Sequence, residues 1–323
     1  MKQDSKNQEF ESINKAYNQI FKVNHLSIGL IVPIETYANS SIPSMLNQLE
    51  RIKLAENLGF SAVWLRDIPF NVPSFGDVGQ IFDPFAYLGF LCAHTTKIAL
   101  GVGSIILPLR HPANIAKSAA SIDILSQGRL ILGVASGDRA EEYPALNIDS
   151  HLRGEKFRES FEYISQVWKD FPIFENNFGT LNGTLDMLPK PLAKKVPMLI
   201  TGSSQQSSDW LAKNGDGWIT YPRNPELQKK FIDLCREKSK NIGVYNKPIS
   251  QSLYIDLDDN FSLSPQPIHL GYRLNTKHLV EHLKSLEKIG VNHVAINLRF
   301  NQANIEKTLE KLARDVLPHF NKS

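Results

Sequence analysis

Residues 97–138 read KIALGVGSIILPLRHPANIAKSAASIDILSQGRLILGVASGD, and this stretch decides the fold. Residues 98–109 form an almost unbroken apolar run rich in β-branched side chains, which predicts a strand buried on both faces. Pro112 stands at an expected first helical position, apolar residues follow it at helical spacing, and Gly128 closes the helix. Residues 130–135 are a second apolar run. The stretch is therefore predicted to be one βαβ unit with parallel strands.

Small residues occur at particular points of these two strands. Gly101, Gly103 and Ser104 interrupt the first strand, and Ser136 and Gly137 follow the second. Because glycine normally weakens a strand, these positions indicate either a flat ligand pressed against the backbone or relief of crowding inside a barrel. In a parallel barrel the ligand lies over the carboxyl ends of the strands, which is where Ser104 and Ser136 are expected.

The alternation of strand and helix continues through the chain. Further buried strands are predicted at 26–34, 61–65, 196–201, 217–221, 249–257 and 294–298. Further helices are predicted at 44–58, 82–94, 150–168, 277–289 and 304–317. Together with the central unit, this makes about eight βα units. The pattern predicts an α/β fold, a (β/α)8 TIM barrel, formed by residues 1–323 as a single domain.

Two segments are too long for simple connections and are predicted to be insertions after the fourth and seventh strands. The first, 169–195, is expected to hold a small hairpin that turns around Asn182-Gly183. The second, 258–275, is expected to cover the barrel mouth. Residues 1–24 are expected to be an N-terminal extension with a short amphipathic helix that packs on the barrel or on a second subunit. The apolar residues of that helix are Phe10, Ile13, Tyr17, Ile20 and Phe21.

Composition excludes several classes of protein. Hydrophobic residues make up 42% of the chain and charged residues 21%, as in ordinary globular proteins. The formal charge of +3 comes without a basic run, so no nucleic-acid partner is expected. No apolar stretch reaches membrane-spanning length and the N-terminus lacks the core of a signal peptide, so the protein is expected to be cytoplasmic, with no membrane partner. Cys92 and Cys235 are expected to be reduced core thiols.

Sequence motifs for several kinds of chemistry are missing. The chain contains no GxxxxGK loop, no GxSxG elbow and no CxxC pair, and HLVEH at 278–282 is not the HExxH motif. Nucleotide hydrolysis, acyl transfer by a serine nucleophile and zinc chemistry therefore lack support, and no metal site is predicted.

The turn at residues 201–207, TGSSQQS, is the strongest candidate for binding an anion. Gly202 lets backbone amides face a ligand, the hydroxyls of Ser203 and Ser204 add donors, and the N-terminus of the following helix adds partial positive charge. These features suit a phosphate. Ordinary serine capping of the helix is the alternative.

GVGSIILPLRHP followed by LSQGRLILGVASGD resembles the corresponding stretch of the bacterial-luciferase-like, flavin-dependent monooxygenases and their deazaflavin-dependent relatives, in particular the luciferase-type oxidoreductases. The resemblance extends over most of the chain. It includes SIGLIVPIE, LAENLGFSAVWLRDIPFNVPSFGDVGQIFDP, LPKPLAKKVPMLITGSS, QSLYIDLDD and GVNHVAINLRF, and the order and spacing of these fragments make it specific.

The resemblance assigns roles to residues at the strand ends. The turn matching Gly202, Ser203 and Ser204 holds the FMN phosphate, and Gly103-Ser104 matches a point that often carries a non-prolyl cis peptide beneath the flavin ring. We therefore predict a cis peptide there. Ser136, Gly137 and Asp138 match positions that border the ribityl chain and the phosphate. For Asp138, an ion pair with Arg139, Arg110 or Arg66 is an equally weighted alternative.

Arg66 and Asp67 end the second strand, where several relatives place a histidine thought to manage protons near the flavin. In this departure from the family pattern, Arg66 can orient an anionic substrate or stabilise the reduced flavin, and we take both residues as the catalytic candidates. The alternative is a buried ion pair between Arg66 and Asp67. Tyr221, at the end of the sixth strand, is expected either to line the pocket or to serve as packing.

The resemblance implies a flavin-dependent oxidoreductase, namely a monooxygenase that uses reduced FMN and oxygen on a small organic substrate. A separate flavin reductase would supply the reduced FMN. A deazaflavin-dependent oxidoreductase that transfers hydride is one alternative, and a non-catalytic flavin-binding protein is another, supported by the missing histidine. Members of the superfamily usually pair through helices of the first half of the barrel, so a homodimer is expected through the alanine-rich helix at 114–126.

Overall fold

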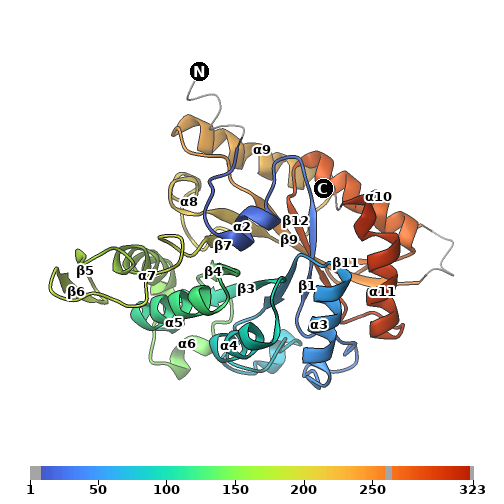
Figure 1. The fold of residues 1–323 in the computed structure, drawn as a ribbon, viewed down its shortest axis with the longest axis horizontal. Helices are drawn as coiled ribbons and strands as arrows, with labels where there is room; N and C mark the ends of the chain where they lie inside the picture. The colour runs from blue at the N-terminus through green and yellow to red at the C-terminus, as the bar shows by residue number, and fades with distance from the viewer. Residues whose placement is uncertain (1–8, 259–263, 321–323) are drawn as a thin grey trace.

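The computed structural model describes residues 9–258 and 264–320, whose helices surround a central group of strands (Figure 1). Eight strands follow one another around a closed sheet, each parallel to its neighbours. The sheet closes because β12 pairs with both β9 and β1, and the predicted (β/α)8 barrel is confirmed. The strands are β1 (Ser27–Ile31), β2 (Ala62–Leu65), β3 (Ala99–Ile106), β4 (Leu130–Ala135), β7 (Met198–Thr201), β8 (Gly217–Thr220), β9 (Ile249–Leu257) and β12 (His293–Asn297).

The predicted helices are present with local shifts at their ends, and residues 142–145 and 225–241 form two helices that were not predicted. The helix predicted from residue 44 starts later because Met45 and Asn47 have φ angles of 59° and 55°, which a right-handed helix excludes. His111 caps the central helix, as its ring accepts a hydrogen bond from the amide of Ala113. The helices are α3 (Gln48–Leu58), α4 (Pro84–His94), α5 (Pro112–Leu125), α6 (Glu142–Ala145), α7 (Arg153–Val167), α8 (Ser208–Asn214), α9 (Pro225–Asn241), α10 (Thr276–Ile289) and α11 (Ile305–Asp315). No helix in the described ranges is both long enough and apolar enough to cross a membrane.

The two glycines of β3 occur for two different structural reasons. A Cβ atom on Gly101 would come within 2.4 Å of the Trp64 ring, which fills the barrel interior beside it. A Cβ on Gly103 would meet no atom nearer than 3.7 Å, and Gly103 is the one exposed residue in this otherwise buried or half-buried strand. Gly101 therefore relieves crowding, whereas Gly103 leaves open space.

The N-terminal extension lies across the barrel. Its short helix α2 (Lys15–Ile20) packs on residues from the barrel interior rather than leaving its apolar face exposed. Tyr17 is 1% exposed and its hydroxyl donates to the carbonyl oxygen of Asp216 at 2.7 Å. The side chain of Asn14 caps the helix and also donates to the carbonyl of Leu130 at 2.8 Å. Because Leu130 begins β4 and Asp216 precedes β8, the helix closes the N-terminal end of the barrel.

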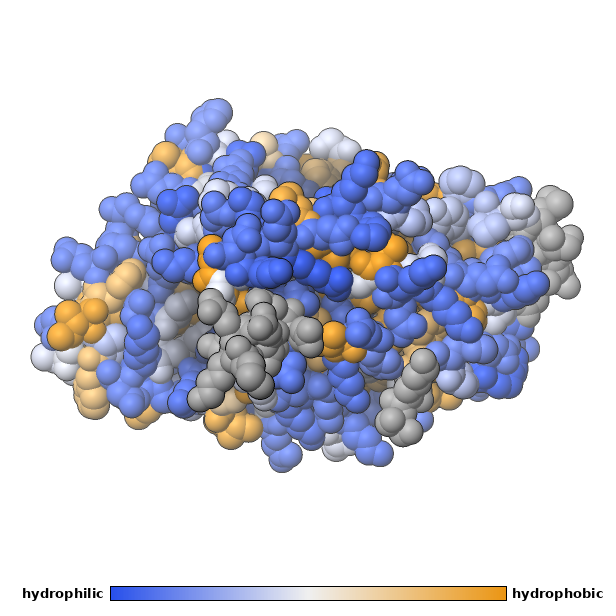
Figure 2. Space-filling model, turned by 90° about the horizontal axis from the view of Figure 1, so that it is seen from above, coloured by the Kyte–Doolittle hydropathy of each residue, from blue (hydrophilic) through white to orange (hydrophobic). Residues whose placement is uncertain are grey.

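The first insertion holds the predicted hairpin, but the predicted turn is wrong. Strands β5 (Ile173–Asn176) and β6 (Gly179–Asn182) pair with Asn176 opposite Gly179, so the chain turns at residues 177–178 and not around Asn182-Gly183. The Asn176 side chain fixes this turn by accepting a hydrogen bond from the amide of Phe178 at 2.9 Å. Phe171 and Ile173 beside this hairpin are exposed apolar side chains. Hydrophobic surface is visible at the left end of the molecule in Figure 2.

The second insertion forms a hairpin beside the barrel. Strands β10 (Gln266–Ile268) and β11 (Gly271–Leu274) are antiparallel, and β11 continues the sheet next to β9. His269 and Leu270, between the two strands, line the cavity at the barrel mouth. Residues 259–263 of the predicted cover lie outside the described residues.

Candidate active site

A cavity of about 630 Å³ opens at the carboxyl ends of the barrel strands, a volume in the usual range for small-molecule sites. Parallel strands bring all of their carboxyl ends to the same side of a barrel, so residues distant in sequence meet there. Every predicted site residue lines this cavity. These residues are Arg66, Asp67, Gly103, Ser104, Ser136, Gly137, Asp138, Gly202, Ser203, Ser204 and Tyr221.

One wall of the cavity is a flat ledge of backbone. The peptide bond between Gly103 and Ser104 is cis, as predicted. The hydroxyl of Ser104 is hydrogen-bonded to the hydroxyl of Thr201, so this side chain turns toward β7 and leaves the ledge clear. Together with the open space above Gly103, this arrangement fits the flat face of a ring system.

The serine turn follows β7. Gly202, Ser204 and Gln205 have φ angles of 58°, 43° and 59°, and alternation of left-handed residues with others can aim successive amides at one point. Within the described chain, the backbone amides of Ser203 and Ser204 donate no hydrogen bond. Gln206 anchors the turn to α7 by donating to the carbonyl of Gly154 at 2.7 Å. Two unpaired amides beside a cavity fit an oxyanion such as a phosphate.

The helix after this turn does not begin directly behind Gly202. Helix α8 starts at Ser208, and its cap is Ser207, whose hydroxyl accepts from the amide of Trp210. The turn therefore separates Ser203 and Ser204 from the helix terminus, which does not contribute at Gly202 as expected. The capping alternative is also wrong for Ser203 and Ser204, since Ser207 performs that role.

Arg66 and Asp67 do not pair with each other, so the alternative of a buried ion pair between them is wrong. Both residues follow the last residue of β2, and each has another partner. Arg110 forms two hydrogen bonds with Asp67, at 2.7 and 3.1 Å. Burial raises the pKa of Asp67 in spite of this partner. Arg66 instead pairs with Asp77, at 2.8 Å.

Asp77 is a residue of the cavity that the sequence analysis missed. Its carboxylate accepts hydrogen bonds from Arg66, from the Tyr37 hydroxyl at 3.1 Å and from the Gly79 amide at 2.8 Å, and it pairs with Arg299 at 3.2 Å. Burial opposes ionisation of Asp77, but Arg66 and the other donors outweigh it and lower the pKa of the carboxyl. In sequence, Asp77 lies in a loop rich in turn residues, and nothing there signals its partners.

Arg139 and Glu142 also line the cavity and were not predicted. Arg139 is 5% exposed, donates to the carbonyl of Asp77 at 2.8 Å and lies 4.5 Å from the ring centre of Phe75. Glu142 is 2% exposed at the start of α6. Asp138 is exposed and forms no ion pair within the described residues, so its predicted pairing with an arginine is wrong. Tyr221 is half exposed and lines the cavity instead of packing in the core.

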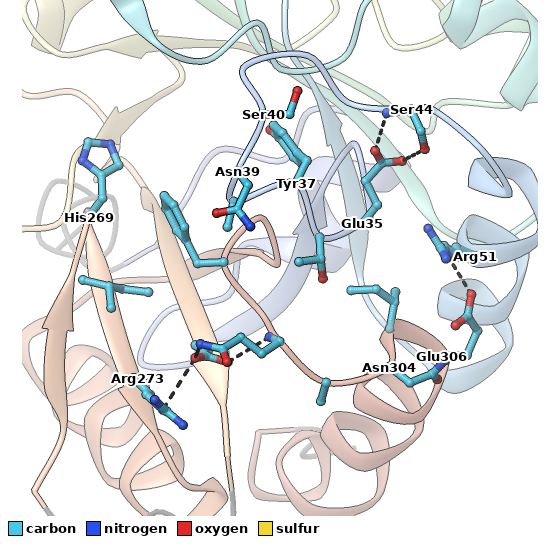
Figure 3. Close-up of a pocket in the computed structure, with 18 of the residues that line it drawn as sticks. Glu35, Tyr37, Asn39, Ser40, Ser44, Arg51, His269, Arg273, Asn304 and Glu306 are labelled. Carbon is cyan, nitrogen blue, oxygen red and sulfur yellow. Dashed lines mark hydrogen bonds and ion pairs between the residues drawn. The ribbon is translucent and has the colours of Figure 1, made fainter.

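A second, wider groove adjoins the cavity and is drawn in Figure 3. It lies between the loop after β1, the β10–β11 hairpin and the loop after β12, and His269 lines both hollows. Its charged groups are paired: Glu35 accepts hydrogen bonds from Ser44, and Arg51 binds Glu306 at 2.7 Å (Figure 3). No cluster of three or more histidine, cysteine or acidic residues suited to a metal ion occurs in the described chain.

A closed parallel barrel whose strand ends carry a polar, glycine-lined cavity is the architecture of a barrel enzyme. Residues 27–255 match the sequence model of a family described as Luciferase-like monooxygenase. The chain belongs to this family, whose members are oxidoreductases.

Relatives of the chain include users of two kinds of cofactor. The oxygenase component of the flavin-dependent trigonelline monooxygenase of Acinetobacter baylyi is 25% identical over 198 residues, which cover 59% of this chain and 52% of that protein. The F420-dependent hydroxymycolic acid dehydrogenase of Mycobacterium tuberculosis is 30% identical over 174 residues, which cover 53% of this chain and 47% of that protein. The chain thus spans about half the length of each.

Solved structures share the fold. An F420-dependent secondary alcohol dehydrogenase in complex with an F420-acetone adduct superposes with a TM-score of 0.75 at 17% identity, covering 92% of this chain and 99% of that one. At this identity the likeness concerns the fold alone.

Proposed function

We propose that the protein is a flavin-dependent monooxygenase that binds reduced FMN in the barrel-mouth cavity and acts with dioxygen on a small organic substrate. The observation that supports this most is the pairing of a flat ledge at Gly103-Ser104 with two unpaired amides at Ser203 and Ser204, on one cavity. A flavin needs both a surface for its ring and donors for its phosphate. When bound, reduced FMN supplies the electrons that activate dioxygen.

In this proposal the residues of the chain bind and orient the cofactor and the substrate, and they exclude water from the cavity. Gly202, Ser203 and Ser204 hold the phosphate, while Gly103 and Ser104 support the ring. Ser136, Gly137 and Asp138 border the ribityl chain of FMN, which joins the ring to the phosphate. Gly137 has a φ angle of 78°, and a Cβ atom there would lie 2.7 Å from the Tyr143 hydroxyl, so backbone alone can occupy this point. Tyr221 forms part of the outer wall.

Arg66 is proposed to face the electron-rich edge of the reduced flavin, held in place by Asp77. Asp67 is a positioning residue in this proposal, since its carboxylate is occupied by Arg110 and by the amide of Ile106. The hairpin residues His269 and Leu270 help to exclude water from the mouth.

Reduced FMN is proposed to come from a separate flavin reductase.

We also propose a homodimer through α4 and α5. Exposed apolar side chains lie on or beside these helices, namely Phe82 and Phe90 at α4 and Ile124 and Leu125 on α5. Static light scattering at micromolar concentration measures this, and a monomeric mass would contradict it. The free thiols of Cys92 and Cys235 support a cytoplasmic location.

Titration of the protein with FMN, followed by flavin fluorescence, tests the site. Ser203→Glu with Ser204→Glu places two carboxylates where the phosphate is proposed, and we expect a loss of FMN affinity of about 100-fold or more. Ser264→Glu, at an exposed position outside the cavity, is the charge control. Unchanged affinity in the double variant would contradict the phosphate site.

A deazaflavin-dependent oxidoreductase is the second candidate, because relatives of both kinds match this chain. The absorption spectrum of the cofactor that the protein retains, and competition between FMN and the deazaflavin, decide between the two. A non-catalytic flavin-binding protein is the third candidate. It predicts no oxygen consumption above that of free reduced FMN across a panel of substrates.

A further inference from the structure

Three arginine side chains gather around the loop after β2. Arg66 and Arg299 both pair with the Asp77 carboxylate, at 2.8 and 3.2 Å. Arg139 reaches the same residue, but it donates to the carbonyl oxygen of Asp77 and not to the carboxylate. One negative charge is therefore shared by two guanidinium groups, and the charge of Arg139 is left without an ion pair inside the described part of the chain.

Arg139 is built into the cavity wall. Its side chain is 5% exposed and lies against the Phe75 ring, and its Nη1 atom is buried with no hydrogen-bond partner among the described residues. Buried polar atoms in folded proteins nearly always have a hydrogen-bond partner, so the Nη1 atom of Arg139 marks a place where a ligand can supply one. Burial and the nearby Arg66 cation lower the pKa of Arg139, because no ion pair balances the charge of its guanidinium group among the described residues.

The nearest candidate partner does not supply the missing charge. Glu142 follows Arg139 by three residues and lines the same cavity, yet the two side chains form no ion pair in the described chain. The Oε1 atom of Glu142 is itself buried without a partner, and burial raises the pKa of this carboxyl, which favours its neutral form. Both groups are thus available to a ligand that enters the cavity.

We propose that Arg139 binds a carboxylate group of the substrate, so that this enzyme acts on small carboxylic acids. This proposal rests on the proposed flavin function, because the serine turn accounts for the phosphate and leaves Arg139 for the second ligand. A guanidinium group donates two parallel hydrogen bonds to a carboxylate, and its contact with Phe75 fixes the orientation of the planar group. Arg66, the arginine that the sequence favours for an anionic substrate, already pairs with the Asp77 carboxylate and is assigned to the flavin in the proposed function.

Benzoate and benzamide are suitable probes, because they have the same shape and differ in charge. Each is titrated into the FMN-loaded protein and followed by the visible absorption of the flavin. We expect benzoate to bind at least about ten times more tightly than benzamide, the difference that a charge-assisted hydrogen bond supplies. In Arg139→Gln we expect the ratio to fall to about one, with benzamide affinity changed by less than about twofold.

Two further variants control the experiment. Arg314→Gln removes an exposed guanidinium group elsewhere and should keep the wild-type ratio. Arg139→Lys keeps the charge but not the paired donors, so it should retain part of the preference even if Arg139→Gln fails to fold. Equal affinity of the wild-type protein for the two probes, or a preference that persists in Arg139→Gln, would overturn the proposal. So would a tenfold loss of FMN affinity in Arg139→Gln, because Arg139 would then belong to the cofactor site.

The same titration separates this proposal from the proposed function. On the flavin-free protein, binding is followed by the intrinsic tryptophan fluorescence, since Trp64, one of the four tryptophans, lines the cavity. If the protein binds neither FMN nor the deazaflavin but still prefers benzoate through Arg139, the flavin function fails and the anion site stands. If FMN binds and the benzoate preference is missing, the flavin function stands and the anion site fails.

Discussion

Glycine residues in the interior of the barrel and at its C-terminal end serve opposite purposes. Gly101 leaves room for the Trp64 ring in the barrel interior, below which α2 covers the N-terminal end. At the C-terminal end, a Cβ atom added to Gly103 or to Gly202 would meet no protein atom nearer than 3.7 Å, so both glycines leave open space. Only one residue of β3, Val102, separates Gly101 from Gly103. A glycine in a barrel strand is therefore informative about a ligand only when its neighbours across the sheet are known.

The largest expected effect tests the closed end. Tyr17 is buried beneath the barrel, so Tyr17→Ala should lower the free energy of unfolding by about 3–5 kcal/mol, as other aromatic deletions from cores do. The matched change at the open end, Tyr221→Ala, removes a half-exposed ring and should cost about 0.5 kcal/mol or less. Urea unfolding followed by circular dichroism measures both. Similar losses for the two variants would remove the distinction between the ends.

The two glycines of β3 offer the sharpest comparison. Gly101→Ala brings a methyl group to within 2.4 Å of the Trp64 ring and should destabilise the protein by about 3 kcal/mol. Gly103→Ala meets open space and should change stability by about 0.5 kcal/mol or less, while weakening FMN binding. Thermal unfolding and FMN titration of both variants measure the two effects. Loss of stability in Gly103→Ala with intact FMN binding would reverse the assignment.

The pH dependence of stability reports on the closed end as well. His293 is fully buried, where Trp64 donates to its Nε2 atom at 2.8 Å, and burial lowers the pKa of the ring to about 3. The unfolded chain takes up the proton near pH 6.5, whereas the folded chain does not until about pH 3. The stabilisation is thus complete above pH 6.5 and is lost as the pH falls, by about 2 kcal/mol between pH 6.5 and pH 5.

Urea unfolding at the two pH values measures this loss. Asp67 and Glu142, whose pKa values are raised, contribute with the opposite sign, so the comparison with His293→Gln isolates the histidine. That variant should show a shallower fall in stability with pH. An equally steep fall in His293→Gln would assign the effect to other groups.

The smallest expected effect separates capping from ligand binding at the serine turn. Ser207→Ala removes the cap of α8 and should cost about 1 kcal/mol of stability without changing FMN affinity. Ser203→Ala should leave stability nearly unchanged and weaken FMN binding severalfold, since its hydroxyl has no role in the cap. Parallel urea and FMN titrations measure both. An exchange of these two effects would show that the serines have been assigned the wrong way round.

Much of the fold was predictable because it depends on local periodicity. The bounds of β4 and β9 agree with the predicted strands, and α5 agrees with the predicted helix, since each is an apolar run or stripe closed by turn or cap residues. The position of the site was also predictable. Parallel strands deliver their carboxyl ends to one side, so Ser104, Ser136 and Ser203 meet there whatever the details of packing.

What the tertiary structure alone decided are the pairings between residues far apart in sequence. Arg110 binds Asp67 across 43 positions, and Arg299 binds Asp77 from a different loop, the one after β12. The sequence places an arginine at the end of β2, but it cannot tell that Arg66 pairs with Asp77, or that Arg139 forms no ion pair with any described residue. Periodicity fixes which face of an element is buried, whereas charge compensation depends on which loops meet above the barrel, and only the closed fold determines that.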